Sequence, residues 1–207
     1  MEKTGTTRTR NRRGEGGRLR EEIIQAAIDL LDETGDERNL TLRSIARQAG
    51  IAAPSIYKHF PDQPAIMLAV VQSAFGELNA SLRAADAGDD PRRRLESVCH
   101  AYLKFAQTHP ERYRTMFGGL WVPTLGEGTS VTADDLGALG VESFDILTRV
   151  LVDCAAAGRS TSQDPATDAV ALWLGLHGLA HQRAVTAAFP WPADIEHRLV
   201  AALAHLS

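Results

Sequence analysis

One short stretch of this chain gathers side chains suited to binding a polyanion. Ile56 and Phe60 lie four residues apart, so on a helix they share one face and pack inward. The Tyr57 hydroxyl and the Lys58 ammonium suit phosphate oxygens. Ser55 and the edge of Ala53 or Pro54 would lie nearer to base edges. The outward residues predicted to contact double-stranded DNA in the major groove are Ala53, Pro54, Ser55, Tyr57, Lys58 and His59.

The preceding segment supplies partners for the phosphate backbone. Thr41 stands before the apolar positions Leu42 and Ile45, which predicts a helix with a hydroxyl cap, and Gly50 ends it. At the start of this helix the Thr41 hydroxyl, the Arg43 guanidinium and free backbone N–H groups could hold a phosphate. Two short helices around a tight glycine turn are typical of a helix-turn-helix.

Helical periodicity runs through nearly the whole chain, and no long alternation of apolar and polar residues predicts a strand. We therefore predict an all-α protein. A first helix is expected from about Arg18 to Thr34. Further helices are expected at residues 42–49, 54–60, 65–85, 95–106, 113–117, 136–157, 166–188 and 195–206, with a glycine-rich loop at 118–132 that could cover or gate a site.

The charge distribution gives the chain a polarity. Residues 1–20 hold seven Lys or Arg against two Glu, a balance of +5, whereas residues 61–207 hold 11 basic against 17 acidic residues, a balance of −6. A polyanion would attract the first segment and repel the second. We expect residues 1–17 to be a basic, disordered arm, 18–64 a helix-turn-helix domain, and 65–207 a domain for effector binding and dimerisation.

The residues Thr41–Ile51 (TLRSIARQAGI), with IYKHF at 56–60, resemble the DNA-binding signature of the tetracycline-repressor family. The resemblance spans about Arg18 to Val71. It implies a homodimer joined through its last two helices and an operator-binding domain in which we expect Arg18 to contact DNA. It also implies a divergent C-terminal domain whose small effector lowers operator affinity.

Two positions depart from the family pattern. Ala52 stands where the family usually has a serine that caps the recognition helix, and losing that cap costs about 1 kcal/mol. Gln63 replaces a frequent lysine and removes one phosphate contact. The arginine-rich arm could compensate by lying along the backbone or entering the minor groove.

The C-terminal half offers bulk for a ligand pocket. Trp173, His177 and Gly178 resemble the Trp-x-x-x-His-Gly stretch of one C-terminal subclass of these regulators. Gly175 and Gly178 would flatten one side of their helix, for the bundle interior or for a dimer seam. The expected effector is apolar or aromatic, and its predicted pocket residues are Tyr102, Phe105, Tyr113, Met116, Phe117, Trp121, Phe144, Leu147, Trp173 and His177.

His177 has two open interpretations. It could hydrogen-bond a ligand, or it could be a core histidine bonded to a backbone carbonyl. Its spacing to His181 also fits a metal, but no third ligand is evident, so we expect no metal and no cofactor. The two cysteines, Cys99 and Cys154, are interpreted as small buried apolar residues, with a redox pair as the alternative.

Motifs and apolar stretches that the sequence lacks exclude several classes of function. The sequence has no nucleophile elbow, phosphate loop, dinucleotide fingerprint or paired-carboxylate motif, so we do not expect an enzyme. The arm lacks an apolar h-region and the longest apolar stretch, residues 169–176, is too short to span a membrane, so we expect a cytoplasmic protein without a membrane partner. The leading hypothesis is an effector-released repressor; the alternative is a sequence-tolerant architectural DNA binder without an effector, which would bind with strong salt dependence.

Overall fold

A computed structural model describes residues 16–119, 121, 125–126 and 128–207 of the chain. Within these residues every named element is a helix, and the only bridge between extended segments joins Ser160 to Leu206. The prediction of an all-α protein is confirmed. The chain divides into two compact units: the N-terminal unit runs to Val70 and includes residues 128–130, and the C-terminal unit holds residues 71–127 and 131–207.

The N-terminal unit contains the predicted short helices. They are α1 (Gly16–Thr34), the 3₁₀ helix η1 (Glu37–Asn39), α2 (Leu42–Gln48), the 3₁₀ helix η2 (Ala53–Lys58) and the start of α3 (Gln63–Ala85). Apolar residues at helical spacing meet in one core because each amphipathic helix must bury its apolar face. Fully buried members of this core are Ile23, Ala27, Leu40, Ile45, Ile56 and Ile66.

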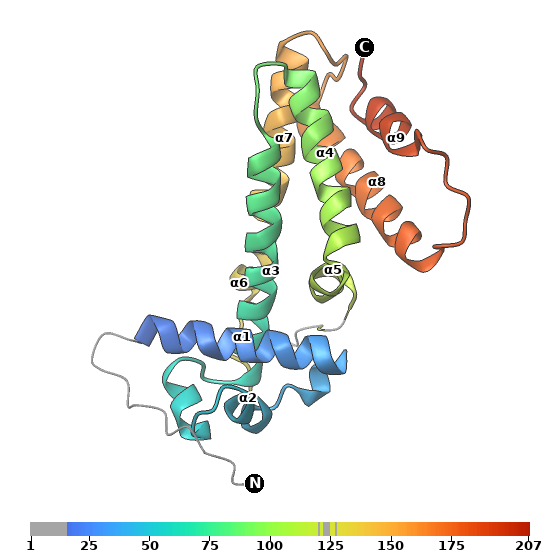
Figure 1. Cartoon of the computed structure of the whole chain (residues 1–207). Helices are drawn as coiled ribbons and strands as arrows, with labels where there is room; N and C mark the ends of the chain where they lie inside the picture. Colours follow the sequence, from blue (N-terminus) through green and yellow to red (C-terminus); the bar gives the residue numbers. More distant parts are fainter. Residues whose placement is uncertain (1–15, 120, 122–124, 127) are drawn as a thin grey trace. The chain divides into compact units, whose positions relative to one another are not determined.

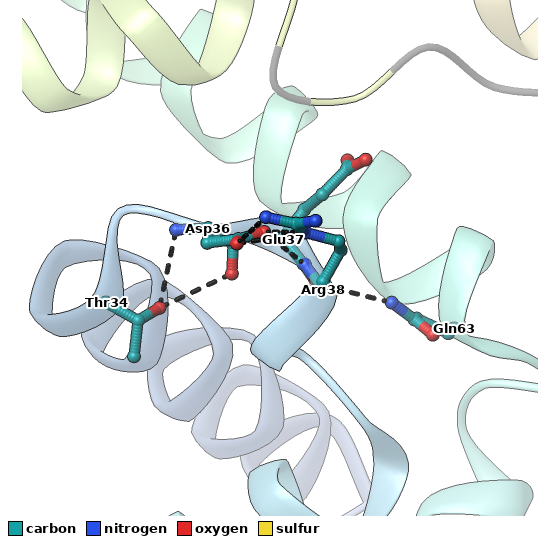
Figure 2. A network of polar contacts seen from close by, with 5 residues as sticks. All are labelled: Thr34, Asp36, Glu37, Arg38 and Gln63. Atoms are coloured by element: carbon teal, nitrogen blue, oxygen red, sulfur yellow. Dashed lines mark hydrogen bonds and ion pairs between the residues drawn. The ribbon is translucent and has the colours of Figure 1, made fainter.

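A polar network holds the turn between α1 and α2, as Figure 2 shows. The Asp36 carboxylate caps η1 by accepting from the Arg38 backbone N–H at 2.9 Å, and it also accepts from the Arg38 guanidinium. These hydrogen bonds from Arg38 hold the pKa of Asp36 below its usual range. The Gln63 side-chain amide donates to the Glu37 carbonyl oxygen at 3.5 Å. The first residue of α3 is therefore tied to this turn.

The C-terminal unit is a helical bundle. After the rest of α3 come α4 (Pro91–Thr108), α5 (Pro110–Phe117), α6 (Ala133–Gly137), α7 (Val141–Ala156), α8 (Pro165–Val185) and α9 (Ile195–Leu203). Helices α4, α7 and α8 pack against one another, and α9 packs on α8 and α4 (Figure 1). Cys99 and Cys154 are free thiols buried in this core, as predicted, and burial raises the pKa of both.

Several predicted boundaries are wrong. The helix expected at 136–157 is broken, because α6 ends at Gly137 and Gly140 adopts a left-handed φ of 75° before α7 begins. The helix expected at 54–60 is the shorter 3₁₀ helix η2, and the last two helices end earlier than expected, at Val185 and Leu203. Helix α4 begins earlier than expected, at Pro91, because the Asp90 carboxylate caps it.

Helix α3 is long and apolar. Of the described helices, it is the one whose length and composition would allow it to cross a membrane, yet half of that window is buried within the fold. Its apolar side chains Ile66, Met67, Leu78 and Leu82 are core residues. The apolar character of α3 is therefore accounted for by packing.

Candidate DNA-reading surface and ligand cavity

The first helix of the helix-turn-helix begins as its sequence predicts. Thr41 has an extended backbone, and its hydroxyl accepts the Ser44 backbone N–H at 3.1 Å, which caps α2. Thr41 and Arg43 are exposed at this helix start. At the other end Gly50 has a φ of 65°, and the Ile51 N–H bonds back to the Ala46 carbonyl oxygen at 2.9 Å. The turn therefore depends on the glycine.

The second element separates its inward and outward residues sharply. Ile56 is fully buried and Phe60 is 2% exposed, whereas Tyr57 is 60% exposed although it adjoins Ile56. Pro54 and Lys58 are also exposed, and Ala53, Ser55 and His59 are partly exposed. An exposed tyrosine offers both an aromatic ring and a hydroxyl group to a binding partner. We call the exposed residues Thr41, Arg43, Pro54, Tyr57 and Lys58, which are candidates for contacting DNA, the DNA-reading surface.

The missing cap is visible in the structure. Ala52 is the cap residue of η2 and has the extended backbone of a cap, but it supplies no side-chain hydrogen bond. The segment winds as a 3₁₀ helix, with the Ser55 N–H bonded to the Ala52 carbonyl oxygen at 2.8 Å. Gln63, the other departure from the family pattern, directs its amide to the Glu37 backbone.

The remaining basic residues of this unit have mixed positions. Arg18 is exposed and ion-pairs with Glu22 one turn later, at 3.1 Å, so any DNA contact must compete with that pair. Arg20 lies with its guanidinium carbon 5.0 Å from the centre of the Phe60 ring, a cation–π contact that sequence analysis missed. The predicted basic arm lies outside the described residues except for Gly16 and Gly17.

The C-terminal unit contains a cavity of about 430 Å³. It is bounded by residues of α3, α4, α5, α7, α8 and the break before α7. Of the predicted pocket residues, Tyr102, Phe117, Phe144 and Trp173 line it. Among the residues that the structure describes, the lining is Phe75, Leu78, Tyr102, Phe117, Leu139, Gly140, Val141, Ser143, Phe144, Val170 and Trp173. Sequence analysis missed the α3 residues Phe75 and Leu78, and near the unforeseen break at Gly140 it found only Phe144.

Other predicted pocket residues lie elsewhere. Phe105 and Leu147 are buried in the core, and Phe105 stacks on His109 with ring centres 4.9 Å apart. Met116 packs partly buried against that core. Trp121 is partly buried and is absent from the cavity wall. Tyr113 and His177 do not line the cavity. Both contact Tyr102, which does line it.

Tyr102, Tyr113 and His177 form a hydrogen-bonded cluster. The Tyr113 hydroxyl lies 2.7 Å from His177 Nδ1, and the two tyrosine hydroxyls are 3.2 Å apart. His177 thus bonds to a side-chain hydroxyl rather than to the backbone carbonyl that one interpretation expected. Burial lowers the pKa of His177, with the charge of His181 adding to the effect. Burial also raises the pKa of Tyr102 to about 12, so the cluster is uncharged at neutral pH.

A polar chain that sequence analysis missed reaches the cavity from another side. The Ser143 hydroxyl donates to Asn79 Oδ1, and Asn79 Nδ2 donates to Glu142 Oε2 at 2.9 Å. Glu142 also pairs with Arg83. Asn79 is buried in mid-helix among apolar residues of α3, which was the available signal in the sequence.

A second hollow of about 650 Å³ is lined by α4 and α9 residues and has a different character. Arg93, Glu96, Lys104 and Glu196 all line it, and Glu196 accepts from His100 at 2.8 Å. Charged side chains thus surround this hollow. In the described part of the chain, no group of three or more His, Cys, Asp or Glu side chains is arranged to hold a metal ion.

These features define a class of protein in which one chain combines a small helix-turn-helix unit with a helical unit that contains an apolar cavity. The sequence model of bacterial regulatory proteins of the tetR family matches residues 23–70, and that of the tetracyclin repressor-like C-terminal domain matches residues 95–206. The chain therefore belongs to the tetR family of bacterial regulatory proteins. The C-terminal match includes the stretch with Trp173, His177 and Gly178.

Individual relatives and solved structures also resemble this chain. The nucleoid occlusion factor SlmA of Photobacterium profundum is 29% identical over 100 residues, 48% of this chain and 51% of that protein, so the chain spans about half the length of the curated relatives it matches. A protein of unknown function from Rhodococcus sp. RHA1 has a TM-score of 0.72 at 27% identity, covering 94% of this chain and 95% of that one. The fatty acid degradation regulator FadR from Bacillus halodurans shares the fold, with a TM-score of 0.69 at 15% identity over 89% and 97% of the two chains.

Proposed function

We propose that this DNA-binding regulator is a homodimeric repressor that leaves its operator when a small apolar molecule fills the C-terminal cavity. Membership of the tetR family makes it a DNA-binding transcriptional regulator. The observation that carries operator reading is the exposed Tyr57 beside the fully buried Ile56 on η2, with Lys58 exposed next to it. Such a surface can contact DNA without disturbing the core.

The DNA-reading surface combines groups with different tasks. Arg43 and the N-terminus of α2 would hold a phosphate, and Tyr57 and Lys58 would hold others. Pro54, with the partly exposed Ala53 and Ser55, would approach the base edges. Partly exposed His59 would lie near the backbone. We place the protein in the cytoplasm with its DNA.

Helix α8 supports the proposed dimer. Val170, Leu174 and Val185 are exposed apolar side chains on α8, and a Cβ at Gly178 would meet no atom within 4 Å. Gly175 instead faces α9, where a Cβ would lie 2.4 Å from Leu203 Cδ1. The two glycines lie three residues apart on neighbouring parts of one side of α8, where Gly175 packs on α9 and Gly178 has open space beside it. Family members typically act as homodimers, and this open side suits a second copy.

Replacing Leu174 by Glu tests the dimer. The charge would be buried in the proposed seam, so we expect sedimentation equilibrium to give a monomer and operator affinity to fall with it. Val152→Glu on α7 is the matched control because Val152 is exposed to a similar degree, 44% against 55%. If the Leu174 variant remains dimeric, the α8 interface is wrong.

The cavity supports effector control. Its volume lies in the usual range for small-molecule sites, and its wall is mostly aromatic and aliphatic. A ligand that prefers the conformation unable to bind DNA lowers the affinity of the protein for its operator. By linkage, the operator lowers the affinity of the protein for that ligand by the same factor. The proposed effector is therefore both an apolar ligand and a negative regulator of DNA binding.

The experiment that tests operator reading is selection of bound duplexes from a random pool at physiological salt. A two-fold symmetric consensus is the expected outcome. Recovery of unrelated sequences would favour the second candidate, a sequence-tolerant DNA binder, to which the likeness to a nucleoid occlusion factor points. Salt titration then separates the two, since sequence-independent binding depends almost wholly on phosphate contacts.

A further inference from the structure

One wall of the C-terminal cavity carries a serine hydroxyl whose proton is directed away to a neighbouring side chain, so that its oxygen can only accept a hydrogen bond. The Glu142 carboxylate is paired with Arg83, so it only accepts, and the Asn79 amide nitrogen must face it. Asn79 Oδ1 then faces Ser143, which donates its single proton to that oxygen. Ser143 lines the cavity. A ligand that reaches its hydroxyl oxygen would therefore meet lone pairs and no proton.

The rest of the wall supplies no charge. Of the described residues that line the cavity, none has an ionised side chain at neutral pH. Tyr102 keeps its proton, and His177 behind it is neutral because burial lowers its pKa. A carboxylate or an ammonium ion would lose its hydration here without gaining a counter-charge. The uncharged wall of this cavity contrasts with the hollow between α4 and α9, which is lined by the charged residues Arg93, Glu96 and Lys104.

The shape of the wall favours a ring. Phe75, Phe117, Phe144 and Trp173 come from four different helices and line the space together with Val141 and Val170. Flat aromatic walls pack best against flat or compact ring systems.

We propose that the cavity binds an uncharged ring compound that carries a hydroxyl group, and that this hydroxyl donates its proton to Ser143 Oγ. The ring fills the aromatic enclosure. Acids and amines of the same size are excluded because the described residues of the wall hold no opposite charge. The identification of this compound as the effector rests on the proposed function, whereas its binding does not.

Titration calorimetry on the full-length protein without DNA tests the ligand class with three matched probes. We expect β-naphthol to bind about tenfold more tightly than β-naphthyl methyl ether, which lacks the proton. The anion β-naphthoate should give no measurable binding. Ser143→Ala should bring the first two affinities together, and Ser143→Thr, which retains a hydroxyl, should restore the preference. Ser97→Ala, a serine of the other hollow, should leave it unchanged.

Three results would overturn the inference. They are absence of binding by every probe, a preference for β-naphthoate, or an unchanged preference in a folded Ser143→Ala protein. If that variant does not fold, the comparison of the three probes on the wild type decides. Operator release is measured separately: probes that bind as expected without displacing DNA would refute the effector function alone, and release by an acid alone would refute the ligand class alone.

Discussion

Tyr113 and His177, 64 residues apart in sequence, are joined by a hydrogen bond of 2.7 Å between the phenol oxygen and Nδ1. The bond connects α5 to α8 beside a cavity-lining residue, Tyr102. Either atom can be the donor, depending on the tautomer of His177, and burial of His177 favours the neutral imidazole. The bond therefore joins two neutral side chains beside the cavity.

Stability should fall in acid through His177. The pKa of His177 in the folded protein lies below its ordinary value of 6.5, so between those two values the unfolded chain binds more protons. The stabilisation is complete above about pH 6.5 and is lost as the pH falls toward the folded pKa, at no more than about 1.4 kcal/mol per pH unit. Urea unfolding at a series of pH values from about 7.5 down to about 5 measures this loss.

His177→Phe should flatten this acid dependence. Tyr113→Phe is the informative comparison because it removes the hydrogen bond but keeps the imidazole buried. We expect that variant to lose about 1 kcal/mol at every pH and to retain the slope. Parallel acid profiles for the wild type and His177→Phe would show that other groups cause the loss.

Tyr57→Ala should separate DNA binding from folding. Because Tyr57 is 60% exposed, we expect the free energy of unfolding to change by less than about 0.5 kcal/mol. Loss of a phosphate contact should weaken operator affinity by about tenfold or more, measured by fluorescence anisotropy on the selected duplex. Tyr57→Phe isolates the hydroxyl from the ring. A loss of stability that matches the loss of affinity would place Tyr57 in the core instead.

Gly140→Ala should be costly, and Gly137→Ala should not. Gly140 has a φ of 75°, and a Cβ there would lie 2.9 Å from Phe75 Cε1, so strain and crowding together should cost about 2 kcal/mol. Gly137 ends a short helix, and a Cβ there meets nothing within 4 Å. Thermal unfolding should rank wild type and Gly137→Ala close together. Equal effects of the two changes would contradict the left-handed cap.

Ala52→Ser should stabilise the recognition element. The Ala52 backbone already has the extended conformation of a cap, so a serine hydroxyl could accept a free N–H of η2 and add up to about 1 kcal/mol. Hydrogen exchange at residues 55–57 would report the gain locally. Ala53→Ser, one residue inside the helix, provides the control. If both serines act alike, capping is not the reason.

Local patterns made the N-terminal unit largely predictable. The Thr41 cap, the Gly50 turn and the inward pair Ile56 and Phe60 depend on neighbours close in sequence, and all were found where expected. The cavity depended on distant contacts. Phe75 and Ser143 come together only because Gly140 breaks the predicted helix. The periodicity of the sequence does not distinguish Gly140 from the other glycines as the place where a helix ends.

The brevity of η2 limits how much sequence one subunit can recognise. Its exposed side chains, Pro54, Tyr57 and Lys58, can touch only a few base pairs, each worth about 1–3 kcal/mol of discrimination. A genome presents roughly a million or more competing sites. A single copy of η2 therefore has too little specificity to select one site in a genome. Two copies that bind two half-sites of the same sequence would multiply that specificity.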